Sequence, residues 1–359
     1  MDRTEPSFAP LELEPRGPLA MAARLWRSGQ NRNATIVVKA TLTLVAKGVA
    51  ALTEPEPVLA DDVWSAGGVL LALNELAPYL PGADILLTAD AHAPTPTPIR
   101  RARARLLVKR GQERLVDKTL FVLGDLAATG EIVPFVRIGL AYDRAVGGRD
   151  NPLGRAQPGV IDPSRPEAPA GFGPIPGSWP VRARLRGKAD TRALEASIAE
   201  LPTDLDAAYF HAAPPDQRVE RLVGDETIEL TGMHPRHEKF ETRLPALRAS
   251  LLVGGESVPL RLDTLRIDLS NERCYLLWRA IVPLEDEALK AIGTIERRDP
   301  VARAAAVRAV MATGPLDSER APPRCRSRPP TPRFACGCGH RRPRRAGDLE
   351  NPANHRRLS

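Results

Sequence analysis

The sequence predicts a mainly β protein with minor α content: antiparallel sheets in a sandwich or barrel-like arrangement, a few short helices and a long Gly/Pro-rich loop. Short runs rich in β-branched residues recur along the chain, and turn residues separate them. Proline makes up 36 of the 359 residues, and it is tolerated mainly in the first turn of helices and at the edges of sheets. Aromatic residues are few, at 4%, so aliphatic side chains must fill most of the core.

The expected strands are runs of alternating or β-branched apolar residues, in chain order 35–46, 84–91, 101–109, 115–123 and 133–142. The Gly-Gly pair at 254–255 predicts a hairpin of 249–253 with 257–262. A second hairpin is expected to join 265–269 to 274–282. Hairpins at such short spacing favour an antiparallel architecture over a βαβ one.

Three short helices are expected. Residues 191–201 carry apolar side chains on one face, with Asp190 as the N-cap and Pro202 as the stop. Residues 285–295 are a second candidate. Residues 299–313 are a third, because an Asp-Pro pair opens the segment and a glycine follows it.

The segment 145–188 is dense in Gly, Pro and polar residues, with Phe172 and Trp179 as its only aromatic side chains. A loop of this length is either disordered or functional, and we expect an ordered surface loop. Its proline content would stiffen it and lower the entropy lost on binding. The sequence leaves two interpretations of Phe172 and Trp179 open: exposed anchors for a partner, or apolar side chains that fasten the loop to the body.

The net charge of +7 belongs to the end of the chain. Residues 314–359 contain 11 arginines and four acidic residues, which leaves 40 basic and 40 acidic residues in 1–313. A neutral body has no general field that attracts phosphates, so we expect no nucleic-acid binding by the folded part. We predict a single domain over 1–313 and a disordered Arg/Pro-rich tail over 314–359.

Three of the four cysteines also lie in that tail, and Cys274 is the only one in the body. A single thiol provides no internal disulfide, which fits a reducing compartment. Residues 1–18 are acidic and Pro-rich, unlike a signal peptide. No run approaches the roughly 20 apolar residues of a membrane span. We therefore expect a cytoplasmic protein without membrane contact.

The tail itself has several interpretations. It lacks lysine while arginine and proline become frequent, a change that a frameshift in a GC-rich gene would produce; resequencing through codon 314 tests this hypothesis. Its arginines are alternatively a site for RNA or an acidic partner. Three thiols and an imidazole are zinc-ligand types, but their spacing matches no common zinc finger: Cys325, Cys336, Cys338 and His340.

The clustered histidines of the body are His211, His234 and His237. His234 and His237 have a spacing that suits a metal ion such as zinc. Pro235 argues against a helix through this pair, and Arg236 would repel a cation. The simpler interpretation is that they are turn residues after a strand.

Four carboxylates close in sequence are candidates for acid–base catalysis, which needs such groups at a fixed separation: Asp216, Asp225, Glu226 and Glu229. The alternative is turn chemistry, in which an acidic side chain bonds nearby backbone. Their catalytic interpretation corresponds to a β-sandwich hydrolase or a carbohydrate-binding module that uses carboxylates near 216–229.

Four segments together resemble the bacterial domain-of-unknown-function family 2169. They are 84–94 (DILLTADAHAP), 142–155 (YDRAVGGRDNPLGR), 169–179 (PAGFGPIPGSW) and 201–235 (LPTDLDAAYFHAAPPDQRVERLVGDETIELTGMHP). The resemblance extends over about residues 10–290 and includes the Val-Lys-Ala-Thr strand at 38–41. His211 departs from the family pattern, which usually has Asn there.

The resemblance implies a role in type VI secretion. Members are similar to adaptors or chaperones that hold a toxic effector in the cytoplasm and help load it onto the spike. The implied partners are the spike protein, the tip protein and the effector. The resemblance implies no cofactor, no metal and no catalytic residue, so we expect that the protein is not an enzyme.

The partner-binding candidates lie in or beside these motifs: Phe172, Ile175, Trp179, Arg182, Asp216 and Gln217. Apolar and arginine side chains held between glycines and prolines provide the low-entropy anchors that interfaces use. Besides the adaptor and the hydrolase or carbohydrate-binding module, a purely structural scaffold remains an alternative.

Overall fold

The computed structural model describes residues 10–196, 198–284 and 288–297 of the chain. All of them belong to the first of two compact units, which extends to residue 304. The expected helix at 299–313 and the expected tail at 314–359 lie outside the described residues. In the described part strands dominate and helices are short, so the mainly β prediction is confirmed.

The largest sheet has eight strands, and β3 (Asn31–Thr43) and β21 (Arg273–Pro283) are its centre. They pair antiparallel along eleven positions, and both contain the β-branched and aliphatic residues that suit such a position. The other strands, with their bounds, are β2 (Ala20–Ser28), β5 (Ala51–Leu52), β8 (Ala83–Thr88), β14 (Ile198–Glu200), β15 (Arg218–Val219) and β20 (Arg261–Asp268).

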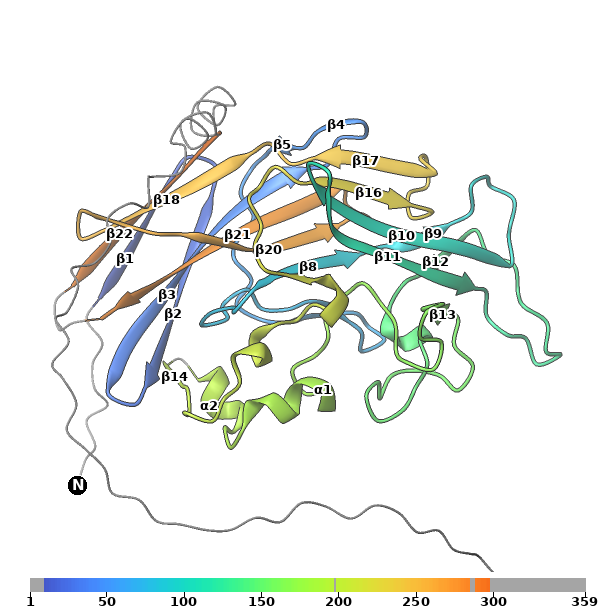
Figure 1. Ribbon diagram of the computed structural model, residues 1–359, viewed down its shortest axis with the longest axis horizontal. Coiled ribbons are helices and arrows are strands. Elements are labelled where there is room, and N and C mark those ends of the chain that lie inside the picture. Colours follow the sequence, from blue (N-terminus) through green and yellow to red (C-terminus); the bar gives the residue numbers. More distant parts are fainter. Residues whose placement is uncertain (1–9, 197, 285–287, 298–359) are drawn as a thin grey trace, which may run out of the picture. The chain divides into compact units, whose positions relative to one another are not determined.

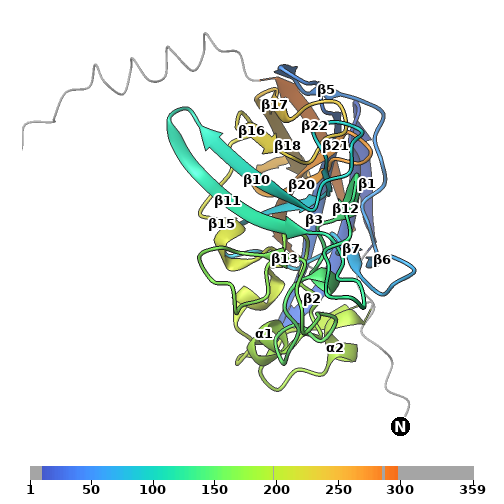
Figure 2. The ribbon, with the colours of Figure 1, turned by 90° about the vertical axis from the view of Figure 1, so that its right-hand side faces the viewer.

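A second sheet of six strands is built around the hairpin of β10 (Arg101–Arg110) and β11 (Glu113–Leu123). Its other strands are β4 (Gly48–Val49), β13 (Val160–Ile161), β16 (Thr227–Thr231) and β17 (Lys239–Arg243). The main apolar cluster joins Val38, Leu42 and Ile85 of the large sheet to Leu106 and Ile228 of this one. The two sheets therefore pack face to face as a sandwich (Figures 1 and 2).

A third sheet has the order β1 (Leu11–Arg16), β22 (Leu289–Arg297), β18 (Leu247–Val253) and β19 (Glu256–Val258). It packs on Ile36 and Ala280, at the other end of the central strands. Ile36 and Val38 point to the same face of β3, so this long strand supports both sheets. Two small two-stranded sheets complete the strands: the hairpin of β6 (Val63–Trp64) with β7 (Leu70–Ala72), and the pair of β9 (Asp90–His92) with β12 (Arg137–Gly139).

The opposite face of the large sheet is covered by the segment 53–79. Lys39 of the Val-Lys-Ala-Thr motif is buried there, and its Nζ lies 2.9 Å from Glu75 Oε2. Arg266 donates two further hydrogen bonds to Glu75 Oε1. A buried lysine is tolerated only when it is paired, so this ion pair explains why the strand can contain a charge.

Four of the sequence predictions need correction. In the described part of the expected helix at 285–295, residues 288–295 are not helical: β22 begins at Leu289 and pairs with both β1 and β18. The helix at 191–201 ends at Glu195, because Ile198–Glu200 pair with β2. The strand at 133–142 contracts to Arg137–Gly139, and 257–262 divides between β19 and β20.

The sheets are also not purely antiparallel, because four strand pairs run parallel: β1–β22, β14–β2, β17–β4 and β8–β20. The short helical elements lie between β12 and β15: η1 (Tyr142–Arg144), α1 (Pro180–Ala183), η2 (Arg184–Arg186), α2 (Thr191–Glu195), η3 (Ala207–Phe210) and η4 (Pro215–Gln217). No described helix has the length and apolar character needed to cross a membrane.

Candidate functional site

The Gly/Pro-rich segment 169–179 lies directly against β8. The amide of Leu87 donates to the carbonyl of Phe172 across 3.2 Å, and the amide of Ile175 donates to that of Ala212 across 2.8 Å. The Phe172 side chain is fully buried in the main core. The expected order is therefore confirmed for this segment, but most of its residues are buried and not on the surface; Figure 1 shows the fold around it.

Lys118 of β11 fastens the loop from the other sheet. Its Nζ donates to the carbonyl of Gly171 across 2.6 Å and lies 2.9 Å from Asp216 Oδ1 and 3.0 Å from Gln217 Oε1. Burial lowers the pKa of Lys118, while the carboxylate of Asp216 opposes that shift. One ammonium group thus joins two of the four motif segments to the body.

Gln217 completes this link at the edge of β8. The side chain is fully buried, and its Nε2 donates to the carbonyls of Ile85 and Phe172 across 2.8 and 2.9 Å. A glutamine fits because one amide group supplies both the two donors and the acceptor that this position requires. The side chain therefore fixes the separation between β8 and the loop.

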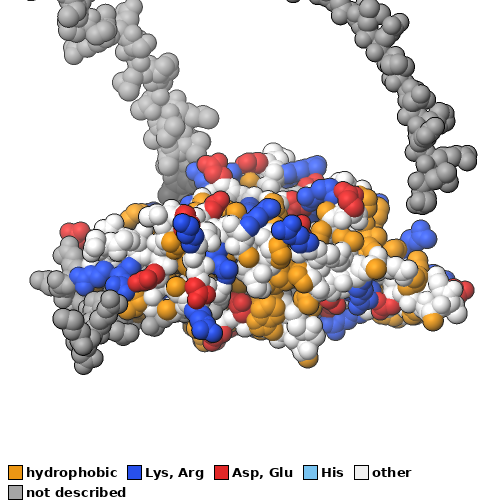
Figure 3. All heavy atoms as spheres, turned by 90° about the horizontal axis from the view of Figure 1, so that it is seen from below, with side chains coloured by type: hydrophobic (Ala, Val, Ile, Leu, Met, Phe, Trp, Pro, Cys, Tyr) orange, Lys and Arg blue, Asp and Glu red, His pale blue; other side chains and the backbone are white. Residues whose placement is uncertain are grey.

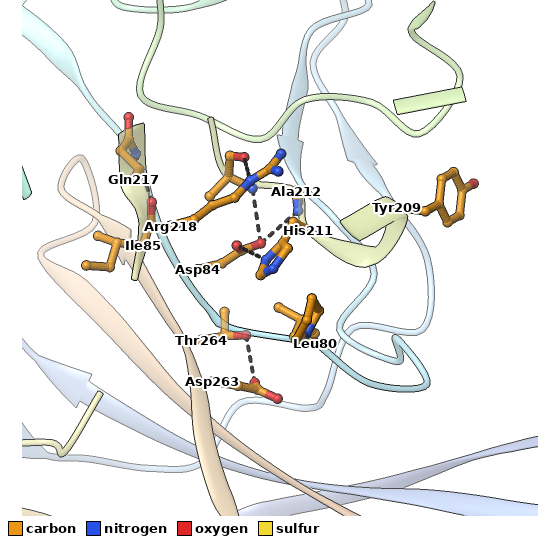
Figure 4. Close-up of polar contacts among 12 residues, drawn as sticks. Leu80, Asp84, Ile85, Tyr209, His211, Ala212, Gln217, Arg218, Asp263 and Thr264 are labelled. Atoms are coloured by element: carbon orange, nitrogen blue, oxygen red, sulfur yellow. Dashed lines mark hydrogen bonds and ion pairs between the residues drawn. The ribbon is translucent and has the colours of Figure 1, made fainter. Parts of the chain in front are cut away.

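Asp84, the first residue of the motif 84–94, accepts three hydrogen bonds (Figure 4). Its Oδ2 accepts the amides of Ala212 and Ala213 across 2.7 and 3.0 Å, and its Oδ1 lies 2.6 Å from His211 Nδ1. The carboxylate and the imidazole are both buried. Asp84 thus positions the chain that follows η3, and His211 takes part in that contact.

Arg182 organises the segment after the loop. Its guanidinium is buried and donates to the carbonyl of Ile175 and, through Nε and Nη2, to the carbonyl of Tyr209 across 3.1 and 2.7 Å. Burial lowers the pKa of Arg182 to about 10. The acceptors of its hydrogen bonds are backbone carbonyls and not carboxylates. Arg182 therefore holds the segments of Ile175 and Tyr209 together, and these contacts do not neutralise its charge.

The motif 142–155 folds into a tight double turn. Asn151 is fully buried and its Nδ2 donates to the carbonyls of Tyr142 and Val146 across 2.8 and 3.0 Å. A Cβ on Gly147 would lie 2.6 Å from the carbonyl carbon of Gly154, so this crossing requires glycine. Tyr142 meets Trp179 edge to face, with ring centroids 5.4 Å apart.

The four segments that carry the family resemblance therefore converge beside β8, although they are distant in sequence. Asp84 joins the first segment to the fourth, Gln217 joins the third to the fourth, and the Tyr142–Trp179 contact joins the second to the third. Nearly every buried polar side chain in this cluster binds backbone groups. Such contacts make the surface above them rigid, which is what a preformed binding surface requires.

Two hollows open on this surface. A groove of about 420 Å³ lies between the segment 60–78, the turn at Gly177 and Ser178, and α2. A smaller apolar pocket of about 40 Å³ is lined by Leu71, Leu140, Leu153 and Trp179 among others. The face that carries α1 and α2, seen in Figure 3, has hydrophobic side chains gathered between charged ones.

Exposed apolar residues flank both hollows. Trp64, on the hairpin of β6 and β7, lines the groove and is 47% exposed. Leu71 and Leu153 line the smaller pocket and are 36% exposed each. We call the groove and these three side chains the loop-face surface. Tryptophan is enriched among residues that dominate interface energies, so Trp64 is the natural anchor of this surface.

The predicted anchors themselves lie beneath that surface. Phe172, Ile175, Trp179, Arg182 and Gln217 are all buried, so the interpretation in which Phe172 and Trp179 fasten the loop to the body is correct. The expectation of exposed anchors at these positions needs correction. The partly exposed side chain among the candidates is that of Asp216, which pairs with Lys118 and with the exposed Arg165.

The four carboxylates of the catalytic alternative have separate surroundings. Glu226 is buried and accepts the amides of Val223 and Gly224 across 2.7 and 2.8 Å, which is turn chemistry. Glu229 pairs with Lys109 and Lys239 across the sheet. Asp216 belongs to the Lys118 link, and Asp225 is half-buried in the turn. In the described part of the chain, the hydrogen bonds and ion pairs of Asp216, Glu226 and Glu229 are therefore with three separate sets of groups.

His234 and His237 lie with Phe240 in a stack of rings. The ring centroid of His234 is 4.8 Å from that of His237 and 4.9 Å from that of Phe240. His234 Nε2 lies 3.1 Å from Glu272 Oε1. No group of three or more metal-ligand side chains occurs among the residues of the described ranges.

Sequence reasoning missed Lys118, Asp84 and Trp64 as individual residues. Lys118 lies on the same face of β11 as the buried Val116 and Leu120, but only the tertiary contact with Gly171 reveals its role. Asp84 was part of a recognised motif, but its partners are 127 or more positions away. A Trp two residues after an Asp-Asp pair was the available signal for Trp64.

Comparison with known proteins gives one match. The model of a family described as "Uncharacterized protein conserved in bacteria (DUF2169)" matches residues 29–279. No curated protein matches the chain, and no solved structure does. The matched range includes all four motif segments and every residue of the Asp84, Lys118 and Arg182 contacts.

Proposed function

This chain belongs to the DUF2169 family of bacterial proteins, and from that premise we propose that it is a cytoplasmic adaptor of type VI secretion. In this role it holds a toxic effector and helps load it onto the spike complex. Its partners are the effector, the spike protein and the tip protein. We expect it to act by binding and not as an enzyme.

One observation carries the proposal: the four motif segments converge, and their buried contacts lie beneath the loop-face surface and hold it in place. Asp84, Gln217 and Arg182 each bind backbone carbonyls or amides of another segment. A surface fixed in this way loses little conformational entropy when a partner binds. The resemblance to effector adaptors then gives the class of partner that such a surface would hold.

The loop-face surface has the composition of an interface centre. Trp64 offers a large exposed ring beside a groove whose floor includes Pro176 and Phe210. The acidic pair Asp61 and Asp62 lies at its rim. Interfaces commonly have an apolar, aromatic centre with polar residues around it, so we place effector contact here.

A pull-down from the native bacterium tests the proposal. Tagged full-length protein should recover a spike component, a tip protein or a candidate toxin, identified by mass spectrometry. The variant Trp64→Ala should weaken partner binding at least about thirtyfold, because a hot-spot truncation costs at least about 2 kcal/mol, and recovery should fall accordingly. Recovery of none of the three classes by the wild-type protein would contradict the proposed function.

Phe121→Ala provides the matched control. Phe121 is 40% exposed but lies on β11, outside the loop-face surface. Its truncation removes a similar apolar area and should leave recovery unchanged. Equal losses in both variants would show that the effect comes from general surface hydrophobicity and that the loop-face surface is not the contact site.

A further inference from the structure

A second groove, of about 610 Å³, lies between β18, β20 and the segment 221–223. Three charged residues line it, and all three are arginines: Arg221, Arg248 and Arg261. The hydroxyl-bearing residues Ser250 and Ser257 line it as well. Because β18 and β20 belong to different sheets, this groove follows the junction between them (Figure 1).

The wall at 221–223 is held by a turn. Gly224 has a φ of +85°, and a Cβ there would lie 3.0 Å from the carbonyl oxygen of Leu247. The buried carboxylate of Glu226 accepts the amides of Val223 and Gly224. The Gly224 carbonyl accepts the amide of Ala246 across 2.8 Å. The position of Arg221 relative to β18 is therefore set before any ligand arrives.

The hydrogen-bond acceptors of the Arg261 guanidinium are backbone carbonyls and not carboxylates. The guanidinium donates to the carbonyls of Leu80, Pro81 and Glu220 across 3.2, 3.2 and 2.8 Å. Carbonyl oxygens satisfy hydrogen-bond donors but carry no net charge. The guanidinium is thus held in place beside the groove by acceptors that carry no net charge.

Arg221 and Arg248 are exposed, and neither side chain takes part in an ion pair in the described ranges. Glu296 is the register partner of Arg248 on β22 and is also exposed. The two do not form an ion pair. Both guanidinium groups are consequently available for a carboxylate or another oxyanion, which arginine binds with two parallel hydrogen bonds.

The apolar residues of the lining that are partly or fully exposed are Val223, Val258, Pro259 and Leu260. We infer that this groove binds an extended segment of a partner protein in which acidic and aliphatic residues alternate. The arginines would receive the carboxylates, and the apolar lining would receive the aliphatic side chains. Such a segment matches both the charge and the apolar character of the groove.

Two observations favour an acidic peptide over a nucleic acid. Residues 1–313 have equal numbers of basic and acidic residues, whereas nucleic-acid affinity depends on contacts with many phosphates. Single-stranded nucleic acids also stack their bases on exposed aromatic rings. The aromatic residue of this groove, Trp278, is 4% exposed and offers no such face.

Fluorescence anisotropy with labelled probes tests this inference, which does not depend on the proposed function. The probe is a short fluorescein-labelled peptide of alternating Glu and Leu, titrated with full-length protein. The double variant Arg221→Glu, Arg248→Glu should weaken its binding at least about tenfold. The control Arg101→Glu reverses an exposed charge on β10, outside the groove, and should change binding less than about twofold.

The basic tail is present in every variant, so its attraction for the probe contributes equally to all of them. Circular dichroism establishes that each variant folds, and Arg221→Lys, Arg248→Lys should retain part of the binding. Equal losses in the double variant and the control would overturn the inference. The inference would also be overturned if a single-stranded oligonucleotide or a Lys-Leu peptide bound as tightly as the Glu/Leu probe and if the same double variant abolished that binding.

Discussion

Lys118 is the side chain through which the six-stranded sheet fixes the Gly/Pro-rich loop. Replacement by Met keeps the apolar stem but leaves the buried Gly171 carbonyl and the Gln217 Oε1 without their donor. We expect Lys118→Met to lower the free energy of unfolding by about 2–3 kcal/mol. Urea denaturation measures this. Arg165→Met, at the exposed partner of the same Asp216, should cost less than about 1 kcal/mol. Similar costs for both would contradict the role of Lys118.

His234 should make stability depend on pH. Burial lowers the pKa of His234 below the ordinary 6.5, against the opposing effect of Glu272, while Arg236 and His237 act in the same direction as burial. As pH falls below about 6.5, His234 therefore binds a proton in the unfolded chain before it does so in the native protein. The free energy of unfolding decreases in that range. The loss is at most about 1.4 kcal/mol per pH unit.

Denaturation midpoints at about pH 7.5 and 5.5 measure this effect. His234→Gln should have a smaller pH dependence than the wild type. His92 will leave a residual dependence of the same sign in the variant, because burial lowers its pKa too. An unchanged dependence in His234→Gln would show that other groups are responsible.

Individual residue roles were predicted best where they depend on local sequence. Asp190 was identified as an N-cap, and its side chain does accept the amide of Arg192. Glu226 likewise makes the turn contacts that its Gly-Asp-Glu sequence suggests. The roles of Lys118 and Asp84 depend on partners distant in sequence, and composition or spacing contains no information on such contacts.

At the level of elements, the end of β16 requires a glycine. Gly232 has a φ of +71°, and a Cβ there would lie within 2.2 Å of the Arg103 carbonyl oxygen on β10. We expect Gly232→Ala to destabilise the fold by about 2–3 kcal/mol, through backbone strain and the displacement of β10. Thermal unfolding measures the change.

Gly111→Ala separates the two contributions. Gly111 joins β10 to β11 with a φ of +60°, but nothing lies within 4 Å of its added Cβ. This variant should show the backbone strain alone, about 1 kcal/mol. If Gly232→Ala costs no more than Gly111→Ala, the close approach of β16 to β10 is not a constraint.

The two expected helices that the structure corrects have one cause in common. Residues 289–297 and 198–200 are extended because β18, β1 and β2 offer hydrogen-bonding partners. Helical periodicity in 285–295 and 191–201 was genuine, but tertiary pairing outweighs such weak propensities. The hairpin of β20 and β21 was predicted because both its strands and its turn lie within one short stretch.

For the whole molecule, the sequence predicted the class of fold but not the order of its strands. The parallel pair of β8 with β20 joins residues 84–88 to 264–268. Similarly, β3 supports two sheets because its apolar face continues from Ile36 to Leu42. Apolar runs indicate burial, but they do not specify which distant strand will cover them.

Cys274 offers a measure of how cooperatively these sheets unfold. It is fully buried in the main core, and β21 is paired on both sides there, with Ile267 of β20 and Leu42 of β3. Burial also raises the pKa of the Cys274 thiol to about 12, so the reactive thiolate is scarce near neutral pH. Alkylation of Cys274 therefore requires separation of the central strands.

We expect Cys274 to resist iodoacetamide in the native protein and to react readily in the urea-unfolded chain. Peptide mapping by mass spectrometry distinguishes this thiol from the other three. Under weakly denaturing conditions the labelling rate should increase with urea as steeply as global unfolding does. A rate nearly independent of urea would instead reveal a local opening at β21. In that case the large sheet would not behave as the single support on which the loop-face surface and the arginine-lined groove both depend.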